Sequence, residues 1–346
     1  MPKFVITSDT HLATYPGAST RDDGANQRLL DVVASLDWVL KVAIDNGAKA
    51  IIHGGDFFHD RKAVKPEVLH RAGEWIDRVR EADIALHMLV GNHDLSIGGV
   101  RASSVRALGG YARIHDTLEV TRICGVAFGW LPYDEDPEVI EAGTKKLKKL
   151  GAEAVIAHLG IGDPRFSDCV PVDYEVPGRI GLSHLRLEAF HQMFIGHYHR
   201  AQELANNCRY IGSPLQLSLR EAGTTKRCLV WDAGKDEVTS VVNRISPQFR
   251  LVTSPEEISH YPESDFIVVK AETREDAEAA SEIAKERGNV RVDRIPPPAV
   301  KARIDTTLPD RDLVAAYVAT HEVSPDDRDP IINLGAEILA HASERR

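Results

Sequence analysis

The stretch FIGHYHR, residues 194–200, places two histidines one residue apart directly behind an apolar run. If residues 192–199 form a β-strand, alternate side chains point to the same side of it. His197 and His199 would then reach into one space, either as two solvated loop side chains or as a pair of ligands. This stretch alone does not decide between the two, but the other apolar runs of the chain bear on the choice.

Other apolar runs in the first half of the chain end in the same way, in glycine or polar residues. They are FVITSD (4–9), AIIHGGD (50–56), ALHMLVGNHD (85–94) and EAVIAHLG (153–160). Between them lie segments with apolar residues at helical spacing, notably 26–46 and 66–82. Strands that alternate with helices predict an α/β fold, with helices layered around β-sheets, and strands without polar alternation are expected to be buried on both faces.

The character of the sequence changes near Pro247. Residues 265–273 and 289–295 are typical of strands, and they flank a helical pattern at 274–288. This second region therefore predicts a smaller α+β domain.

A proline-rich break at 295–300 is followed by two expected helices, 310–320 and 330–343. Asp329 is a good cap for the second helix, and Pro330 suits its first turn. We therefore expect the chain to divide into three parts, 1–245, 246–305 and 306–346.

Composition limits the kind of protein. The chain has 346 residues and a formal net charge of −10, which argues against a broad basic surface for nucleic acid. No apolar run is long enough to span a bilayer, and the start MPKFVITSD lacks the pattern of a signal peptide. The four cysteines are scattered, so neither a zinc ribbon nor a disulfide framework is suggested. We expect a cytoplasmic protein without a membrane partner.

Side chains that bind metals follow the apolar runs. Because strand ends meet at one edge of an α/β sheet, we expect these side chains to converge. Carboxylate, amide and imidazole groups together suit a divalent transition metal better than calcium, and the lack of cysteine argues against a structural zinc. D-x-H, G-G-D or H-x-H alone also occurs in ordinary turns, but their succession predicts a metal centre. The candidate ligands are Asp9, His11, Asp56, Asn92, His158, His197 and His199.

The order D-x-H, G-D, G-N-H-D, a lone histidine and G-H-x-H resembles the signature of calcineurin-like metallophosphoesterases, over roughly residues 1–220. The resemblance implies a layered metallophosphoesterase sandwich with two divalent metal ions bridged by Asp56. One ion would be bound by Asp9, His11, Asp56 and His199. The other would be bound by Asp56, Asn92, His158 and His197. The two histidines of the opening stretch would then face different ions, and the net positive centre would accept a phosphodiester anion and activate water.

Two further histidines are candidates for catalysis. His93 follows a predicted ligand, so we expect it to overhang the phosphate and to protonate the departing oxygen. The stretches GDFFHDRKAV (55–64) and YIGSPLQLSLRE (210–221) are similar to the nuclease subunit of the SbcC–SbcD complex and its double-strand-break repair counterparts. In that family, the histidine matching His59 works beside the one matching His93. The alternative is that His59 is a surface turn residue and that G-S-P only closes a turn.

The resemblance implies a manganese-dependent DNA exonuclease and endonuclease of DNA repair and recombination, acting as a homodimer with an SbcC-like coiled-coil ATPase. Residues 246–305 would be its DNA-capping domain and 306–346 its contact with the ATPase. The helix 66–82 would take the place of the dimer helix, although plain packing on its own sheet explains it equally well. The chain lacks G-x-x-x-x-G-K-[ST], so ATP hydrolysis would need another polypeptide.

Two other functions stay open. One is a small-molecule phosphodiesterase or phosphatase in which residues 246–346 form a lid, and the other is a scaffold without metals. The scaffold fits less well, because every predicted ligand position is filled. Among the remaining histidines, His87 and His115 are expected to be core or surface residues.

Overall fold

The computed structural model describes residues 2–16, 18–21, 24–97, 102–162, 180–293, 308–321 and 323–343. Its contacts divide the chain into two compact units, Met1–Val292 and Asp293–Arg346. The proline-rich break predicted at 295–300 lies outside the described residues. Among the described residues, no helix combines the length and the apolar character that crossing a membrane requires.

The first sheet of the larger unit has six strands in the order β12-β11-β1-β2-β3-β4. Strands β1 to β4 are parallel to one another, and β11 runs antiparallel to both β1 and β12. The strands are β1 (Lys3–Thr7), β2 (Ala50–His53), β3 (Ala85–Leu89), β4 (Arg113–His115), β11 (Arg227–Asp232) and β12 (Glu237–Val242).

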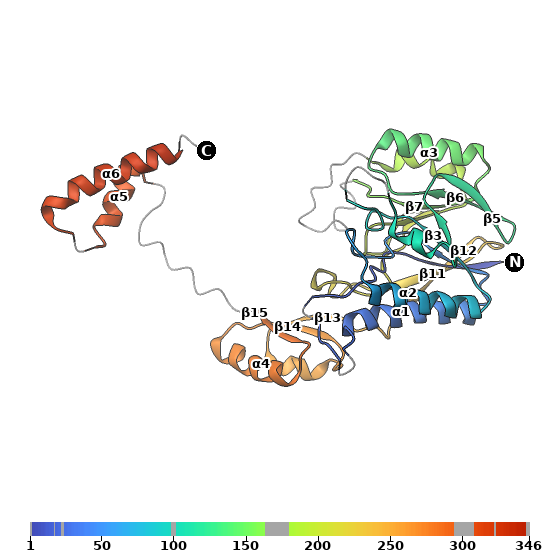
Figure 1. The fold of residues 1–346 in the computed structure, drawn as a ribbon, viewed down its shortest axis with the longest axis horizontal. Helices are drawn as coiled ribbons and strands as arrows, with labels where there is room; N and C mark the ends of the chain where they lie inside the picture. The colour runs from blue at the N-terminus through green and yellow to red at the C-terminus, as the bar shows by residue number, and fades with distance from the viewer. Residues whose placement is uncertain are drawn as a thin grey trace. The chain divides into compact units, whose positions relative to one another are not determined.

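Two helices cover the outer face of this sheet, α1 (Gln27–Asp45) and α2 (Pro66–Glu81) (Figure 1). Their apolar stripes pack with the strands in one buried cluster, as their helical periodicity predicted. Helix α1 begins where the side chain of Asn26 accepts a hydrogen bond from the backbone N–H of Leu29. Helix α2 begins with Pro66, whose fixed φ suits a first turn.

The second sheet also has six strands, in the order β5-β6-β7-β8-β10-β9. Strands β6, β7, β8 and β10 are parallel, and the outer strands β5 and β9 pair antiparallel. The helix α3 (Pro137–Lys149) packs its apolar side on this sheet. The strands are β5 (Glu119–Ile123), β6 (Val126–Leu131), β7 (Ala154–His158), β8 (Gln192–Gly196), β9 (Gln202–Ala205) and β10 (Cys208–Tyr210).

The two sheets pack face to face. Phe4 of β1 meets Phe128 of β6 edge to face, with ring centroids 4.9 Å apart, in a cluster that draws buried residues from both sheets. Every residue of β2, β7 and β8 is buried, so the expectation of strands covered on both faces is confirmed. The predicted α/β sandwich, with helices layered around β-sheets, is confirmed as well.

A small third sheet follows, made of β13 (Phe249–Val252), β14 (Phe266–Lys270) and β15 (Val290–Asp293), with the helix α4 (Arg274–Glu286). This is the predicted strand–helix–strand region. It belongs to the larger unit by its contacts. The guanidinium of Arg28, from α1, lies over the rings of Phe249 and Phe266 at 5.3 and 5.1 Å. The small sheet is therefore anchored at the beginning of α1.

The second unit contains the helices α5 (Asp310–Val318) and α6 (Pro325–Ser343). The prediction that the last helix begins at Pro330 was wrong, because it begins at Pro325 and Pro330 lies inside it. Pro325 suits a first turn as well as Pro330 does, and the acidic Asp326 and Asp327 then lie at the positive end of the helix dipole. Only one backbone hydrogen bond is lost at Pro330.

Short 3-10 helices complete the described elements. They are η1 (Ser104–Leu108), η3 (Leu182–Leu185), η4 (Leu187–Ala189), η5 (Leu219–Glu221) and η6 (Pro255–His260).

Candidate active site

The loops that follow β1, β2, β3, β7 and β8 converge at one edge of the sandwich. The structure brings together every residue that the sequence predicted for the metal centre and for catalysis. They are Asp9, His11, Asp56, His59, Asn92, His93, His158, His197 and His199.

One group of these side chains is built around His11. Its Nε2 atom lies 3.0 Å from Nε2 of His199 and 3.6 Å from a carboxylate oxygen of Asp56. Asp9, His11 and His199 can each place one ligand atom within 4.8 Å of the others. Two ring nitrogens and two carboxylates thus face a common space.

A second group is built around Asn92. Its side-chain oxygen lies 2.9 Å from Nδ1 of His197 and 3.0 Å from Nε2 of His158. The same nitrogen of His158 lies 3.4 Å from Oδ2 of Asp56. This is the Asp56 oxygen that also faces His11. One carboxylate oxygen therefore stands between the two groups, at the position of a bridging ligand.

The backbone adopts an unusual conformation at several of these residues. Asp9, His11, Asp56 and His197 all have positive φ, which non-glycine residues rarely adopt. Such strain persists where the surrounding structure holds it in place, and it gathers at functional sites.

Asp94 supplies part of that support. Its Oδ2 atom accepts hydrogen bonds from the backbone N–H groups of Asp56 (2.8 Å) and Gly91 (3.0 Å). Its Oδ1 atom accepts from the N–H groups of Phe57 (3.0 Å) and Phe58 (3.1 Å). One buried carboxylate thus fixes the loop that follows β2 against the loop that follows β3.

Glycines give these loops room. A Cβ atom on Gly91 would overlap the side chain and backbone of Asp56, and one on Gly196 would overlap Ser8 and the carbonyl of Gly54. The motifs G-N-H-D and G-H-x-H therefore need their glycines because the backbones approach closely at the site.

Partners outside the site orient two of the imidazoles. His158 donates from Nδ1 to the carbonyl of Gly54 at 2.8 Å, which turns Nε2 toward the side-chain oxygens of Asn92 and Asp56. His199 contacts a carboxylate oxygen of Glu221 through Nδ1 at 3.0 Å, which leaves Nε2 toward His11.

His93 and His59 stand at the mouth of the site. Their rings are stacked, 5.2 Å apart and 15° from parallel, and Nδ1 of His93 lies 2.9 Å from the carbonyl of His59. The backbone N–H of His93 donates to Asp56 at 2.7 Å. His59 also places Nδ1 3.1 Å from Nδ1 of His11, so it is more than an isolated surface turn residue.

Burial and neighbouring charges decide the protonation of the site. Burial lowers the pKa of His11 well below its ordinary value, and burial together with His158 lowers the pKa of His197 to about 3. Burial opposes the charge of His158 too, but the Asp56 carboxylate outweighs it and raises that pKa to about 9. His11 and His197 are therefore neutral, which is the form that binds a metal.

The donor set fits divalent cations. It offers imidazole nitrogens, carboxylate oxygens and one amide oxygen, without a thiolate, and most of these atoms face one another rather than protein donors. Comparison with protein families gives a match to calcineurin-like phosphoesterase over residues 2–209.

The chain belongs to this family. The match covers more than half of the chain, and it ends within β10. The family predicted from the sequence is thereby confirmed, and with it the enzyme class, a metal-dependent phosphodiesterase.

Several curated proteins are similar to this calcineurin-like phosphoesterase. Exonuclease subunit 1 of Enterobacteria phage T4 is 25% identical over 251 residues, which is 67% of this chain and 68% of that protein. The DNA double-strand break repair protein Mre11 of Halobacterium salinarum is 30% identical over 38% of this chain and 32% of that protein. The Mre11 of Methanocaldococcus jannaschii is 26% identical over 57% and 51%. The alignments thus span about half or less of the length of the Mre11 proteins.

Among solved structures, the comparison aligns the chain with that of a novel archaeal phosphodiesterase. The TM-score is 0.36 with 16% identity, over 70% of this chain and 99% of that one.

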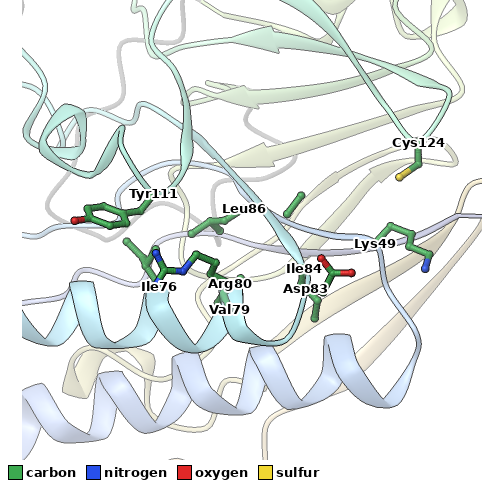
Figure 2. A pocket seen from close by; sticks show the side chains of 10 residues that line it. Lys49, Ile76, Val79, Arg80, Asp83, Ile84, Leu86, Tyr111 and Cys124 are labelled. Carbon is green, nitrogen blue, oxygen red and sulfur yellow. The ribbon is translucent and has the colours of Figure 1, made fainter.

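A hollow of about 470 Å³ lies elsewhere, at the amino-terminal ends of β2 and β3 (Figure 2). It is lined by Lys49, Arg80, Asp83, Tyr111 and Cys124 together with apolar residues of α2 and β3. None of the predicted site residues lines it, so it is separate from the edge where the predicted ligands converge.

Sequence reasoning missed Asp94, Glu221 and Lys226. Asp94 is the aspartate of the G-N-H-D motif, so the sequence did single it out, but no role was predicted for it. Glu221 and Lys226 follow the predicted G-S-P turn, and no local pattern connects them with His199.

Proposed function

We propose that this phosphoesterase is a manganese-dependent DNA exonuclease and endonuclease with two metal ions, the nuclease subunit of an SbcC–SbcD-like complex. One observation supports the proposal more than any other. The predicted ligands form two groups of donor atoms, and Asp56 turns one carboxylate oxygen to both, at 3.6 Å from His11 and 3.4 Å from His158.

The assignment of ligands follows the two groups. Asp9, His11, Asp56 and His199 would hold one ion, and Asp56, Asn92, His158 and His197 the other. Two divalent cations at this place would activate a water molecule and neutralise charge on the phosphate. An amide at Asn92, in place of a third carboxylate, keeps the net charge of such a centre positive.

The chain's own residues would bind and orient the substrate. His93 lies at the mouth, beside the predicted ligands, so its ring is placed to donate a proton to the departing oxygen. Its backbone N–H holds the carboxylate of Asp56, so the position of His93 and that of the bridging group are linked. The stacked ring of His59 keeps His93 from turning away.

The choice of DNA as substrate rests on the relatives. The phage relative is an exonuclease subunit and the archaeal relatives are double-strand break repair proteins. The small sheet β13–β15 would be the DNA-capping domain that the resemblance to this nuclease family implies. The net charge of −10 adds nothing to DNA affinity, so a partner protein would have to help hold the duplex.

The C-terminal helices support a helical partner. On α6, Ile331, Leu334 and Ile338 form one stripe at helical spacing, and they are 43%, 60% and 60% exposed. Such an apolar stripe fits the coiled-coil base of an SbcC-like ATPase.

A homodimer is proposed from the resemblance to the family alone. The side chains of α2 expected at a dimer interface, among them Ala72, Trp75 and Val79, are buried against their own sheet. A dimer would therefore use the exposed side of α2 or another surface, and light scattering in solution tests whether it exists.

The decisive experiment supplies linear DNA and bis-p-nitrophenyl phosphate in parallel, with manganese, in the presence and absence of the SbcC-like ATPase of the same genome. We expect the DNA to be cleaved, and cleaved faster with the ATPase. Hydrolysis of the small ester but never of DNA, even with the ATPase, would instead establish a small-molecule phosphodiesterase.

A further inference from the structure

A buried glutamate lies directly behind His199. Glu221, the last residue of η5, places Oε1 3.0 Å from Nδ1 of His199, and its side chain is 13% exposed. The opposite nitrogen of the ring, Nε2, is the one that faces His11. The carboxylate therefore touches the imidazole on the side away from the predicted metal.

The other oxygen of Glu221 is held by two donors. Lys226 places Nζ 2.5 Å from Oε2, and the backbone N–H of Leu217 donates to the same oxygen at 3.2 Å. Lys226 is only 5% exposed and also donates to the carbonyl of His199 and to Oγ of Ser213, each at 2.9 Å. Its three ammonium protons are thus all used, and both oxygens of the carboxylate have partners that hold its orientation.

We propose that Glu221, locked in place by Lys226, is a positioning residue that sets the tautomer of His199. Because a carboxylate accepts and does not donate, Nδ1 of His199 must hold its proton toward Glu221. The lone pair then lies on Nε2, directed at the predicted ion. Carboxylate support of this kind also makes a ligating imidazole more basic and fixes its plane.

The inference rests on the proposed role of His199 as a ligand, but it goes beyond that role. Two of the predicted ligand histidines are oriented by different kinds of group. His158 contacts the backbone carbonyl of Gly54, and His199 contacts a charged side chain. The backbone carbonyl of Gly54 can only accept a hydrogen bond, whereas Glu221 can be replaced by a residue that donates one to His199. The alternative is that Glu221 and Lys226 only close the loop between β10 and β11.

The substitution Glu221→Gln separates these alternatives. Lys226 and the N–H of Leu217 are both donors, so the amide oxygen of glutamine has to stay with them. Its NH₂ group then faces Nδ1 of His199, which becomes an acceptor, and the ring proton moves to Nε2. That proton points into the predicted metal site and opposes ligation.

The first measurement is the tautomer of the histidines, by long-range ¹H–¹⁵N NMR of the metal-free protein at a pH high enough to make the rings neutral. We expect the wild type to show His199 with its proton on Nδ1 and Glu221→Gln to show it on Nε2. Finding the proton of the wild-type His199 on Nε2 would overturn the inference, even if the variant failed to fold.

The second measurement is Mn²⁺ binding by calorimetry. We expect Glu221→Gln to weaken one of two binding steps by about 10- to 100-fold. The matched control is Glu203→Gln, because Glu203 is ion-paired with Arg209 and Arg227 and has no contact with a site imidazole among those that the structure records. It should bind as the wild type does.

The outcomes distinguish the two proposals. A wild type that takes up no Mn²⁺ would count against the proposed metal site itself. A wild type that binds two ions, with Glu221→Gln unchanged in both tautomer and affinity, would leave that site standing and refute the role of Glu221.

Discussion

Two clusters of histidines can be compared in this molecule. In the predicted metal site, Nε2 of His11 lies 3.0 Å from Nε2 of His199. Between the sheets, Nδ1 of His87 lies 3.0 Å from Nε2 of His115. Distance alone does not separate the pairs, yet only the first has the surroundings of a metal site.

The difference lies in what completes each pair. His115 uses its other nitrogen on Glu119, at 2.6 Å, and its ring stacks on Trp130 with centroids 3.5 Å apart. The contacts of the second pair therefore run in a line, from ring to ring to carboxylate. Around His11 and His199, carboxylates converge on the same space. Convergence of a third and fourth donor, rather than closeness of two histidines, marks the metal site.

The backbone conformation also differs between the two clusters. His87 and His115 lie within the strands β3 and β4. His11 and His197 lie just beyond strands and have positive φ. In a regular strand, the pleat sets the side to which each side chain points. A residue in a strained loop can direct its side chain elsewhere.

The largest effect is expected for Asp56→Ala, which removes the oxygen shared by both groups of ligands. We expect loss of bound metal, seen by calorimetry with Mn²⁺, and a fall in turnover of roughly 10³-fold or more. Asp45→Ala, which changes an exposed aspartate at the end of α1, is the control and should act as the wild type. Metal uptake that survives Asp56→Ala would mean that the site lacks a bridging carboxylate.

A smaller effect is expected for His93→Ala, because the backbone N–H that holds Asp56 stays in place. Metal binding should persist while turnover falls by about 10²- to 10⁴-fold, the usual contribution of a general acid. The exposed His70 offers a matched control in His70→Ala. Unchanged DNA cleavage by His93→Ala would show that the ring does not donate the proton.

The smallest effect concerns stability and tests the second cluster. Burial lowers the pKa of His87 and of His115 to about 3, with Arg113 adding to both shifts. The unfolded chain binds these protons near pH 6.5, so the stabilisation is complete above that pH and is lost progressively as the pH falls toward 3. Each histidine should cost about 2 kcal/mol of unfolding free energy at pH 5 relative to neutral pH.

The variant His87→Phe removes one of these protonation sites and keeps an aromatic ring beside Trp130. Its free energy of unfolding, measured with urea at pH 8 and pH 5, should fall less between the two than that of the wild type. An equal fall would mean that His87 is not held neutral in the folded protein. Mn²⁺ binding should not change, because this cluster contributes no ligand.

Much of the fold and of the site could be predicted because the information is local. Apolar runs predicted the strands, helical spacing predicted α1 and α2, and each motif stands directly behind its strand. The start of α6 was misplaced because two prolines, Pro325 and Pro330, satisfy the same local rule. Glu221 could not be found, because it contacts His199 across a separation of 22 residues that only the path of the folded chain brings together.

The four backbone amides gathered by Asp94 have a consequence for how ions would enter. The loop around Asp56 owes its shape to an internal carboxylate, so the conformational entropy of ordering it is lost when the chain folds and not when a cation arrives. The protein differs in this respect from small zinc domains, which are unfolded without their metal. Removing the ions with a chelator should therefore leave this loop ordered, and ions should bind again without any refolding of the chain.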